Sequence, residues 1–241
     1  MDDLIDVDDP ASWPPLVRAW AAEQADRLRG SANFTEDLRF FPDRDEEFRA
    51  RLAGRKLRVY HATRLLDHEV SWIREHGLRP LTRELVEERI EAAHQHGYLT
   101  AAERERLLAE NVFALGYAQD REGLVNLVIG RRGYDDDPTD VTPLLSAWGG
   151  EGIYRAAEGL EEYLARLGRP AIVAAAVDLS GSFPEAPTSP SLPNLFVGRL
   201  LELPHCWAVL QIRRSVPTQD VLAIWQPGHP EYDRHRELPP T

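Results

Sequence analysis

The order of helix-forming and strand-forming segments constrains this chain more than any other feature. Periodicity and capping residues predict two helices, one strand and three more helices, in this order: residues 16–28, 45–52, 57–61, 67–76, 82–96 and 100–118. Mostly strands follow, with one helix predicted among them: strands at 124–129, 171–177, 207–212 and 219–225, helix at 151–167. Helices and strands do not alternate regularly, so the order predicts an α+β fold with a mixed or antiparallel sheet.

The same reading divides the chain into two parts. Residues 1–55 are expected to form an N-terminal helical extension, and residues 56–241 the main domain. Within that domain, residues 82–118 form a predicted helical hairpin. Residues 180–194 are rich in Ser and Pro and are expected to be a long irregular loop, a kind of segment that often binds ligands.

Composition narrows the class of protein. The formal net charge of −12 argues against a protein that coats nucleic acid. Cys206 is the only cysteine, so the chain cannot form an internal disulfide. The acidic N-terminus does not resemble a signal peptide, and no apolar run approaches the roughly 18 residues of a membrane span. We therefore expect a cytoplasmic protein without a membrane partner. The strong preference for Arg, with Lys56 the only lysine, is typical of a GC-rich bacterial genome.

The first segment with chemical potential is Tyr60-His61-Ala62-Thr63-Arg64. We expect the strand to end at His61, where a cleft can form. The small Ala62 would let a ligand approach the backbone, whose N–H and C=O groups can clasp an amide. His61 could hydrogen-bond a ribose hydroxyl, and Arg64 could meet a pyrophosphate. The simpler interpretation is a histidine at the end of a strand that binds only its neighbours.

The second segment is Trp148-Gly149-Gly150-Glu151-Gly152-Ile153-Tyr154. Its glycines, Gly150 among them, permit a tight turn and a close approach of the backbone. Tyr154 could stack on a flat heteroaromatic ring, and Glu151 could stabilise a developing positive charge. The alternative is a turn at the start of a helix, with Tyr154 in the core and Glu151 on the surface.

Together, these segments resemble the ADP-ribosyltransferase superfamily, which includes diphtheria toxin and the poly-ADP-ribose polymerases. The family's strand ending in His-small-Thr is matched by His61-Ala62-Thr63, and the Gly-Leu pair that often follows is matched by Gly77-Leu78. The Gly-x-Gly-Ile-Tyr segment of the polymerase branch is matched by residues 150–154. The resemblance spans residues 56–226, although its motifs occupy a small part of that range and short motifs also match by chance.

The resemblance implies an ADP-ribosyltransferase-like split sheet and NAD⁺ as the substrate. His61 would hold the adenosine ribose, with Thr63 supporting it, and the Ala62 backbone would clasp the nicotinamide amide. Tyr154 would stack on nicotinamide. The reaction implied is cleavage of the nicotinamide–ribose bond through an oxocarbenium-like state, by a transferase or an NAD⁺ glycohydrolase. A bacterial toxin or defence effector would fit this activity.

The chain departs from the family at the third motif. The family usually has a Glu at the start of a late strand, where this chain has Gln219 and Asp220. The acid is therefore Asp220, or Glu151 from the glycine turn, or transferase activity is lost. Tyr154 also follows His61 by 93 positions, so the helical hairpin would be an insertion.

Three functions remain open from the sequence. The first is an NAD⁺-cleaving enzyme, and the second is a non-catalytic NAD⁺- or ligand-binding module on the same fold. The third is an enzyme like the RNA 2′-phosphotransferases, which the acidic composition disfavours. No metal site is expected, because His94 and His96 do not share a helix face and Asp135, Asp136 and Asp137 lack the pattern of a calcium loop. The acceptor (protein, nucleic acid, small molecule or water) and the oligomeric state are not determined by the sequence.

Overall fold

A computed structural model of the chain describes residues 3–30, 45–135, 141–153, 159–178, 191–204, 206–235 and 238–239. Its α-helices are α1 (Pro15–Arg29), α3 (Asp45–Leu52), α4 (Asp67–His76), α5 (Arg83–Gln95), α6 (Ala101–Ala109), α7 (Thr142–Ser146), α8 (Glu161–Leu164), α9 (Leu192–Leu200) and α10 (Pro230–Asp233). Its strands are β1 (Leu4–Ile5), β2 (Lys56–Leu65), β3 (Val125–Ile129), β4 (Arg169–Asp178), β5 (Ala208–Ile212) and β6 (Val221–Trp225). Short 3₁₀ turns include η5 (Gly150–Gly152) and η6 (Thr218–Asp220).

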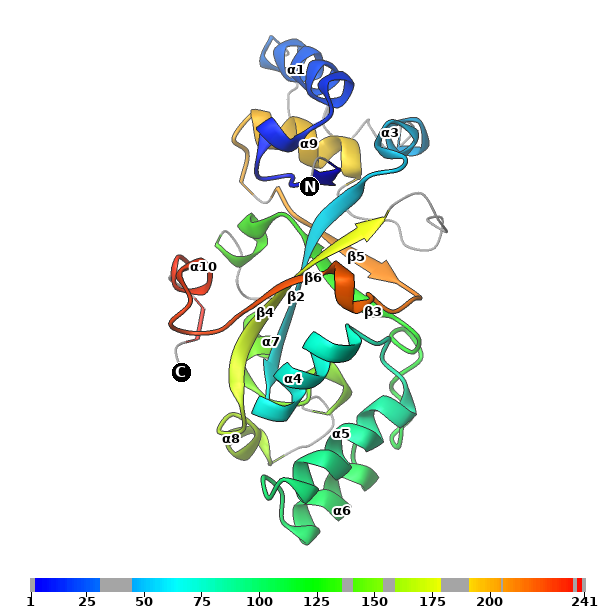
Figure 1. Cartoon of the computed structure of the whole chain (residues 1–241), viewed down its shortest axis with the longest axis vertical. Helices are drawn as coiled ribbons and strands as arrows, with labels where there is room; N and C mark the ends of the chain where they lie inside the picture. Colours follow the sequence, from blue (N-terminus) through cyan, green and yellow to red (C-terminus); the bar gives the residue numbers. More distant parts are fainter. Residues whose placement is uncertain are drawn as a thin grey trace. The chain divides into compact units, whose positions relative to one another are not determined.

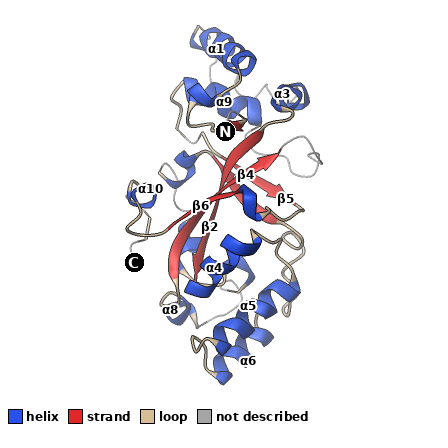
Figure 2. Cartoon of the chain, in the orientation of Figure 1, coloured by secondary structure: helices blue, strands red, loops and turns tan. Residues whose placement is uncertain are grey.

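The strands form one six-stranded sheet, shown in red in Figure 2. They hydrogen-bond in the order β5-β3-β2-β4-β6, and β1 pairs with β2. β1 and β2 run parallel, with Leu4 opposite Lys56, whereas β2 and β3 run antiparallel, with Tyr60 opposite Val128. The prediction of an α+β fold with a mixed sheet is confirmed at this level.

The chain divides into two compact units, which are described separately below. The first contains Met1–Tyr60, Asn126–Asp137 and Ala175–Gln211, and the second contains His61–Val125, Pro138–Ala174 and Ile212–Thr241. Residues 1–60 thus share a unit with two later segments. A separate extension of residues 1–55 beside a domain of residues 56–241 stays a prediction.

In the first unit, α1, α3 and α9 pack together, as Figure 1 shows. Phe48 of α3 lies between two aromatic side chains, with its ring centroid 5.0 Å from those of Trp20 and Phe196. Trp13 contacts the same Phe196 edge-on at 4.7 Å. Aromatic rings bury large apolar areas and prefer such tilted contacts, so these four rings anchor the three helices to one another. The sequence analysis did not predict α9.

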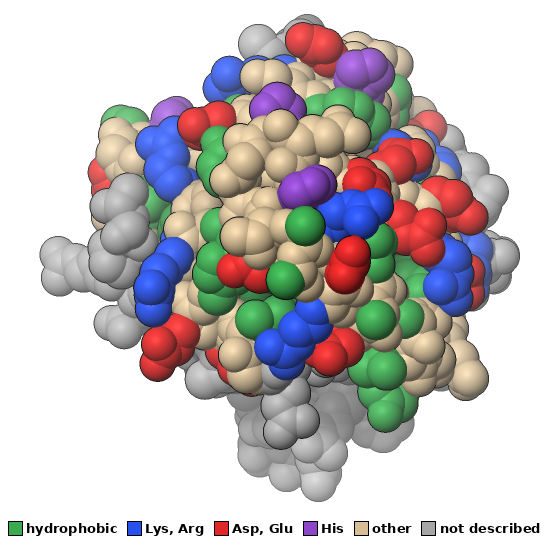
Figure 3. Space-filling model, turned by 90° about the horizontal axis from the view of Figure 1, so that it is seen from below, with side chains coloured by type: hydrophobic (Ala, Val, Ile, Leu, Met, Phe, Trp, Pro, Cys, Tyr) green, Lys and Arg blue, Asp and Glu red, His purple; other side chains and the backbone are tan. Residues whose placement is uncertain are grey.

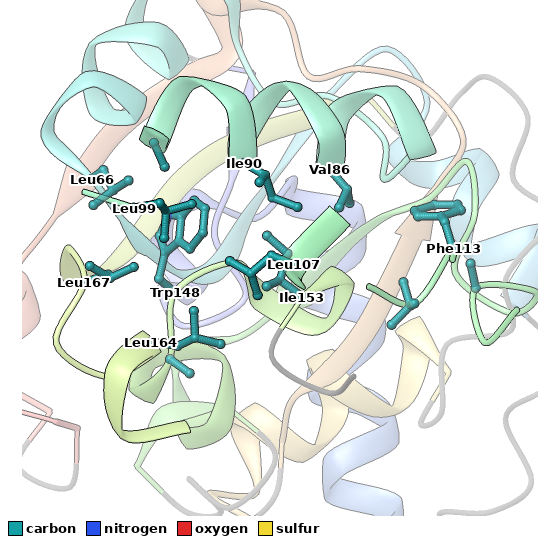
Figure 4. Packing of buried hydrophobic residues seen from close by; sticks show 14 residues of the cluster. Leu66, Val86, Ile90, Leu99, Leu107, Phe113, Trp148, Ile153, Leu164 and Leu167 are labelled. Carbon is teal, nitrogen blue, oxygen red and sulfur yellow. The ribbon is translucent and has the colours of Figure 1, made fainter. Parts of the chain in front are cut away.

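The second unit has its own hydrophobic core, drawn in Figure 4. Its buried residues come from α5, α6, the segments on both sides of η5, and α8 with the segment after it: Val86, Ile90, Ala93, Leu107, Ala147, Trp148, Ile153, Leu164 and Leu167, with Leu66, Leu99, Val112, Phe113 and Ala118 beside them. Trp148 is fully buried in this cluster, near Leu66, Leu99 and Leu167. The predicted helical hairpin is therefore an integral part of this core.

Several helices lie where the sequence placed them. α3 and α4 have the predicted bounds, and α1 ends at Gly30 as expected. The predicted Thr100–Glu103 capping box opens α6, with each side chain bonded to the other residue's backbone N–H. α6 ends earlier than predicted, at Ala109, because the Asn111 side chain bonds the carbonyls of the last helical turn and the next backbone N–H groups.

Two expectations about the candidate segments need correction. β2 continues to Leu65, so His61 lies within the strand and not at its end. The helix predicted over residues 151–167 is not continuous: the described part contains η5 and the short α8, and Gly159 has a φ of +78°, outside the helical range. Residues 154–158, Tyr154 included, lie outside the described residues.

Most of the loop predicted at residues 180–194 also lies outside the described residues, while α9 begins at Leu192. Past Pro227, the structure contains the short helix α10. Among the described helices, none combines the length and the apolar character needed to cross a membrane.

Candidate functional site

The second unit contains a cavity of about 210 Å³ between β2, α4 and α5. Three side chains of β2 form one side of it: His61, Thr63 and Leu65. Alternate residues of a strand point to the same face, which explains why these three share the cavity. Ala62 and Arg64 are not among its lining residues. The structure therefore brings His61 and Thr63, two of the predicted site residues, to one cavity.

Arg64 has a structural role in the described chain. Its Nε donates to the carbonyl of Leu167 over 2.7 Å, and its Nη1 donates to the carbonyl of Leu145 over 3.2 Å. Only 8% of its surface is exposed, and burial lowers the pKa of its guanidinium. Its donors tie β2 to α7 and to the segment after α8, so the predicted contact with a pyrophosphate has no support from this geometry.

Two helices supply the other walls of the cavity. The lining residues recur at helical spacing along one face of each: His68, Glu69, Trp72 and Ile73 on α4, and Leu85, Glu88, Arg89 and Ala92 on α5. Gly77, Leu78 and Arg79 also line the cavity. Half of the fourteen lining residues are thus apolar or glycine and half carry polar or charged side chains, so the cavity offers both apolar packing and hydrogen bonds to a small molecule.

Gly77 lets the chain turn sharply at this end of α4. Its φ is +82°, and a Cβ atom there would lie 2.0 Å from the carbonyl oxygen of Val216. The neighbouring Leu78 pairs with Val216 through two backbone hydrogen bonds of 2.9 Å. The segment that leads to η6 is therefore held against the end of α4, next to the cavity.

Glu69 connects the cavity to its surroundings. Its Oε1 accepts a hydrogen bond from Arg89 Nε at 2.6 Å. Its Oε2 accepts from the backbone N–H of Leu66 at 2.8 Å and from Trp148 Nε1 at 2.9 Å. Only 7% of Glu69 is exposed. Three donors thus satisfy a buried carboxylate that joins the start of α4, α5 and the glycine-rich segment.

The glycine-rich segment reaches the same network through its backbone. The Gly149 carbonyl accepts from Arg89 Nη1 at 3.3 Å, and the Arg89 guanidinium lies 5.4 Å from the centre of the Trp148 ring. Gly149 has a φ of +98°, and a Cβ atom there would lie 2.4 Å from the Ile153 side chain. Only glycine therefore allows this turn. The glycine-rich segment therefore contacts Glu69 and Arg89, which line the cavity together with His61 and Thr63 of the first segment, although the glycine-rich segment supplies no lining residue itself.

The predicted acids lie outside the lining of the cavity. Glu151 forms an ion pair with Arg121, one-fifth of its side chain being exposed. Gln219 and Asp220 belong to η6, which packs against α4, and the Thr218 hydroxyl next to them donates to the carbonyl of Glu75 at 2.9 Å. Gly150 is not a lining residue either, and Tyr154 lies outside the described part of the chain.

The sequence analysis missed the charged residues that line the cavity. Besides Glu69 and Arg89, these are Arg79 and Glu88. Arg79 Nη1 lies 2.5 Å from Glu88 Oε2, and the Glu88 side chain is 59% exposed. A signal was present for α5, because Glu88 and Arg89 fall between Leu85 and Ala92 on the helix face that lines the cavity. For Glu69 the signal was weaker, because Leu66 lacks the side-chain oxygen that usually precedes a capping Glu.

His68 is a further ionisable group of the wall. Its ring stacks on that of His96, with centroids 4.2 Å apart and an angle of 13° between the planes. Burial lowers the pKa of His68 below its ordinary value of 6.5, and the charges of His96 and Arg89 act in the same direction. The carboxylates of Glu69 and Asp67 oppose this change. Burial therefore favours the neutral form of His68.

The charges of the cavity balance, since two carboxylates pair with two guanidinium groups. Over the described residues, no group of three or more His, Cys, Asp or Glu side chains is placed to hold a metal ion.

Comparison with known proteins identifies no family for this chain, because no family model, curated protein or solved structure matches it.

Proposed function

We propose that the cavity between β2, α4 and α5 binds NAD⁺ and that the protein is an ADP-ribosyltransferase or NAD⁺ glycohydrolase. The observation that carries the proposal is the placement of the two motif segments around one cavity. His61 and Thr63 of the first segment line it, and Trp148 and Gly149 of the second hydrogen-bond Glu69 and Arg89 in its wall without lining it themselves.

The shape and chemistry of the cavity suit one ring of a dinucleotide. Apolar side chains such as Leu65, Ile73 and Leu85 can pack on a flat ring, while His61 and Thr63 offer hydrogen bonds to ribose or amide groups. The volume of about 210 Å³ is below the range of about 300–1,000 Å³ typical of sites that enclose a whole drug-sized ligand. We therefore assign one nucleoside end of NAD⁺ to the cavity and the remainder to its mouth.

Cleavage of the nicotinamide–ribose bond develops positive charge on the ribose, which a carboxylate can stabilise. Glu69 is unsuited to this, because its oxygens already accept three hydrogen bonds. Glu88 lines the cavity and its side chain is more than half exposed, so its carboxylate can reach a ligand at the mouth. We assign the electrostatic role to Glu88, with Glu151 and Asp220 as the alternatives from the sequence.

The test is release of nicotinamide from NAD⁺ by the purified protein, followed by chromatography with and without cell lysate. Glu88→Gln is expected to reduce release at least tenfold, as loss of a charge aimed at the transition state does. Glu110→Gln is the matched control, because Glu110 lies just beyond α6, pairs with Arg106 and is not a lining residue. Glu151→Gln and Asp220→Asn test the alternative acids. Absence of both nicotinamide release and calorimetric NAD⁺ binding would reject the proposal.

A non-catalytic NAD⁺-binding module is the second candidate. It is favoured by the position of Glu151, Gln219 and Asp220, none of which lines the cavity. This candidate predicts NAD⁺ binding without turnover. Any nicotinamide release that falls with substitution of Glu88, Glu151 or Asp220 excludes it.

An RNA 2′-phosphotransferase-like activity has less support. Figure 3 shows acidic and basic side chains interspersed over one face of the molecule, with no extended basic surface there. Binding of RNA phosphates usually needs clustered positive charge. Incubation of a 2′-phosphorylated RNA with the protein and NAD⁺ tests this activity, and loss of the phosphate would support it.

A further inference from the structure

One wall of the cavity contains buried nitrogen atoms without hydrogen-bond partners. They are both ring nitrogens of His68 and Nη2 of Arg89. The other two nitrogens of the Arg89 guanidinium donate to Glu69 and Gly149, so only Nη2 is left over. Both side chains line the cavity. Buried polar atoms without partners destabilise a fold, and where they border a cavity a ligand can supply the missing partners.

The chemistry of these atoms indicates an oxyanion. Nη2 of Arg89 can only donate hydrogen bonds, and an imidazole ring carries at least one N–H donor. A ligand that satisfies both residues must therefore present acceptor oxygens. The charge of Arg89 is already balanced by Glu69, so an added anion would leave the wall negative. Protonation of His68 would restore the balance and give it a second donor.

The surroundings of His68 allow such a change. Asp67 and Glu69 beside it on α4 favour its protonated form, whereas Arg89 of α5 and His96 just beyond α5 disfavour it. His96 is exposed and stacks on the ring of His68. A bound oxyanion adds a negative charge close to the ring and so favours its protonation.

We propose that His68 and Arg89 form a phosphoryl-binding subsite in the wall between α4 and α5, and that His68 takes up a proton when the oxyanion binds. The inference rests on the proposed function only in naming the diphosphate of NAD⁺ as the natural source of the phosphoryl group. A phosphate monoester on an acceptor has the same chemistry and is the other source.

The first experiment uses sulfate as a tetrahedral oxyanion that does not itself titrate near neutral pH. The imidazole signals of His68 are followed by NMR during a pH titration, with and without sulfate. We expect sulfate to raise the pKa of His68 and to bind more tightly at pH 6 than at pH 8. A pKa that sulfate leaves unchanged would overturn the proposal, whatever variants of the protein do.

The matching variant is His68→Phe, which keeps a ring for stacking on His96 and removes both nitrogens. It is expected to weaken binding of sulfate and of ADP-ribose about tenfold or more, the loss typical of one hydrogen bond to a charged group. His76→Phe is the control, because His76 lies on the same helix, is exposed and is not a lining residue. Equal binding by the wild type and His68→Phe contradicts the subsite.

Two further ligands identify the source of the phosphoryl group. Competition with sulfate by ADP-ribose points to the dinucleotide, and competition by adenosine 2′-monophosphate alone points to a phosphate monoester. The outcomes also separate this inference from the proposed function. Sulfate binding through His68 without NAD⁺ binding or turnover rejects the function and keeps the subsite. Turnover of NAD⁺ with an unchanged KM in His68→Phe, together with equal sulfate binding by the wild type and this variant, rejects the subsite and keeps the function.

Discussion

Replacing Glu69 by Ala tests whether the wall of the cavity is built around one buried carboxylate. In the structure, Glu69 accepts hydrogen bonds from Leu66 N–H, Trp148 Nε1 and Arg89 Nε, and its side chain is 9% exposed. Without the carboxylate, the Leu66 N–H and Trp148 Nε1 donors lose their acceptor, and the charge of Arg89 stays largely buried without its partner. The variant should therefore lose far more stability than the removal of a surface charge would cause.

The magnitude follows from burial. Breaking a buried ion pair by removal of one partner costs about 3–5 kcal/mol. For a chain of this length, each kcal/mol lowers Tm by about 2–4 °C, so Glu69→Ala should lower Tm by roughly 6–20 °C. Glu88→Ala is the matched control, because Glu88 also lines the cavity and also pairs with an Arg, but its side chain is 59% exposed. An exposed pair contributes about 0–1 kcal/mol, so the control should lower Tm by at most about 4 °C.

The assay is thermal unfolding followed by calorimetry and by tryptophan fluorescence, which reports on Trp148. Glu69→Gln should fall between the wild type and Glu69→Ala, because its amide oxygen can still accept from Trp148 while its amide nitrogen faces the Arg89 donor. Equal and small changes in Tm for Glu69→Ala and Glu88→Ala would refute the reasoning, since they would place the Glu69 carboxylate in water.

Three further predictions concern the same unit. Burial lowers the pKa of His68 in the folded state below 6.5, so on acidification the unfolded chain takes up a proton before the folded chain does. The free energy of unfolding should therefore fall as the pH drops below about 6.5. In denaturant titrations, His68→Phe should remove this contribution of His68 to the pH dependence. Gly77→Ala should cost about 2–5 kcal/mol in the same titrations, and the control Gly97→Ala, also at positive φ but with open space around its Cβ position, only about 1–2 kcal/mol. Trp148→Phe should cost about 3 kcal/mol and lower the near-ultraviolet circular dichroism, because it leaves a gap in the core and removes a donor to Glu69. A cost below 1 kcal/mol would contradict the buried position of Trp148.

The elements that the sequence predicted well are those with local signals at both ends. α1 follows Pro14 and ends at Gly30, and the start of α6 carries a capping box. β2 was predicted too short, because the alternation of apolar and polar residues stops at His61 although the strand continues to Leu65. Residues 62–65 are all buried, and a strand buried on both faces has no alternating pattern.

The candidate site was predictable only where it lies within a motif. His61 and Thr63 could be named because they belong to one short run of sequence. Glu88 and Arg89 reach the cavity from α5: their spacing places them on one face of the helix, but which face borders the cavity depends on how the helix packs. The sequence analysis gave Trp148 no role beside the glycines, and its complete burial follows from packing in the core that α5 and α6 help to form. A residue's closeness to a motif in the sequence therefore predicts its place in the cavity less well than the face of the helix on which it lies.

The most direct test of the central claim is an NMR titration of the methyl groups with NAD⁺. If the cavity between β2, α4 and α5 binds the dinucleotide, the methyl signals of Leu65, Ile73 and Leu85 should shift in a saturable way. Those of Ile5 and Val17, which belong to the core of the first unit, should not move. Saturable shifts that leave the three cavity methyl groups unchanged, or no shifts at millimolar NAD⁺, would contradict the account.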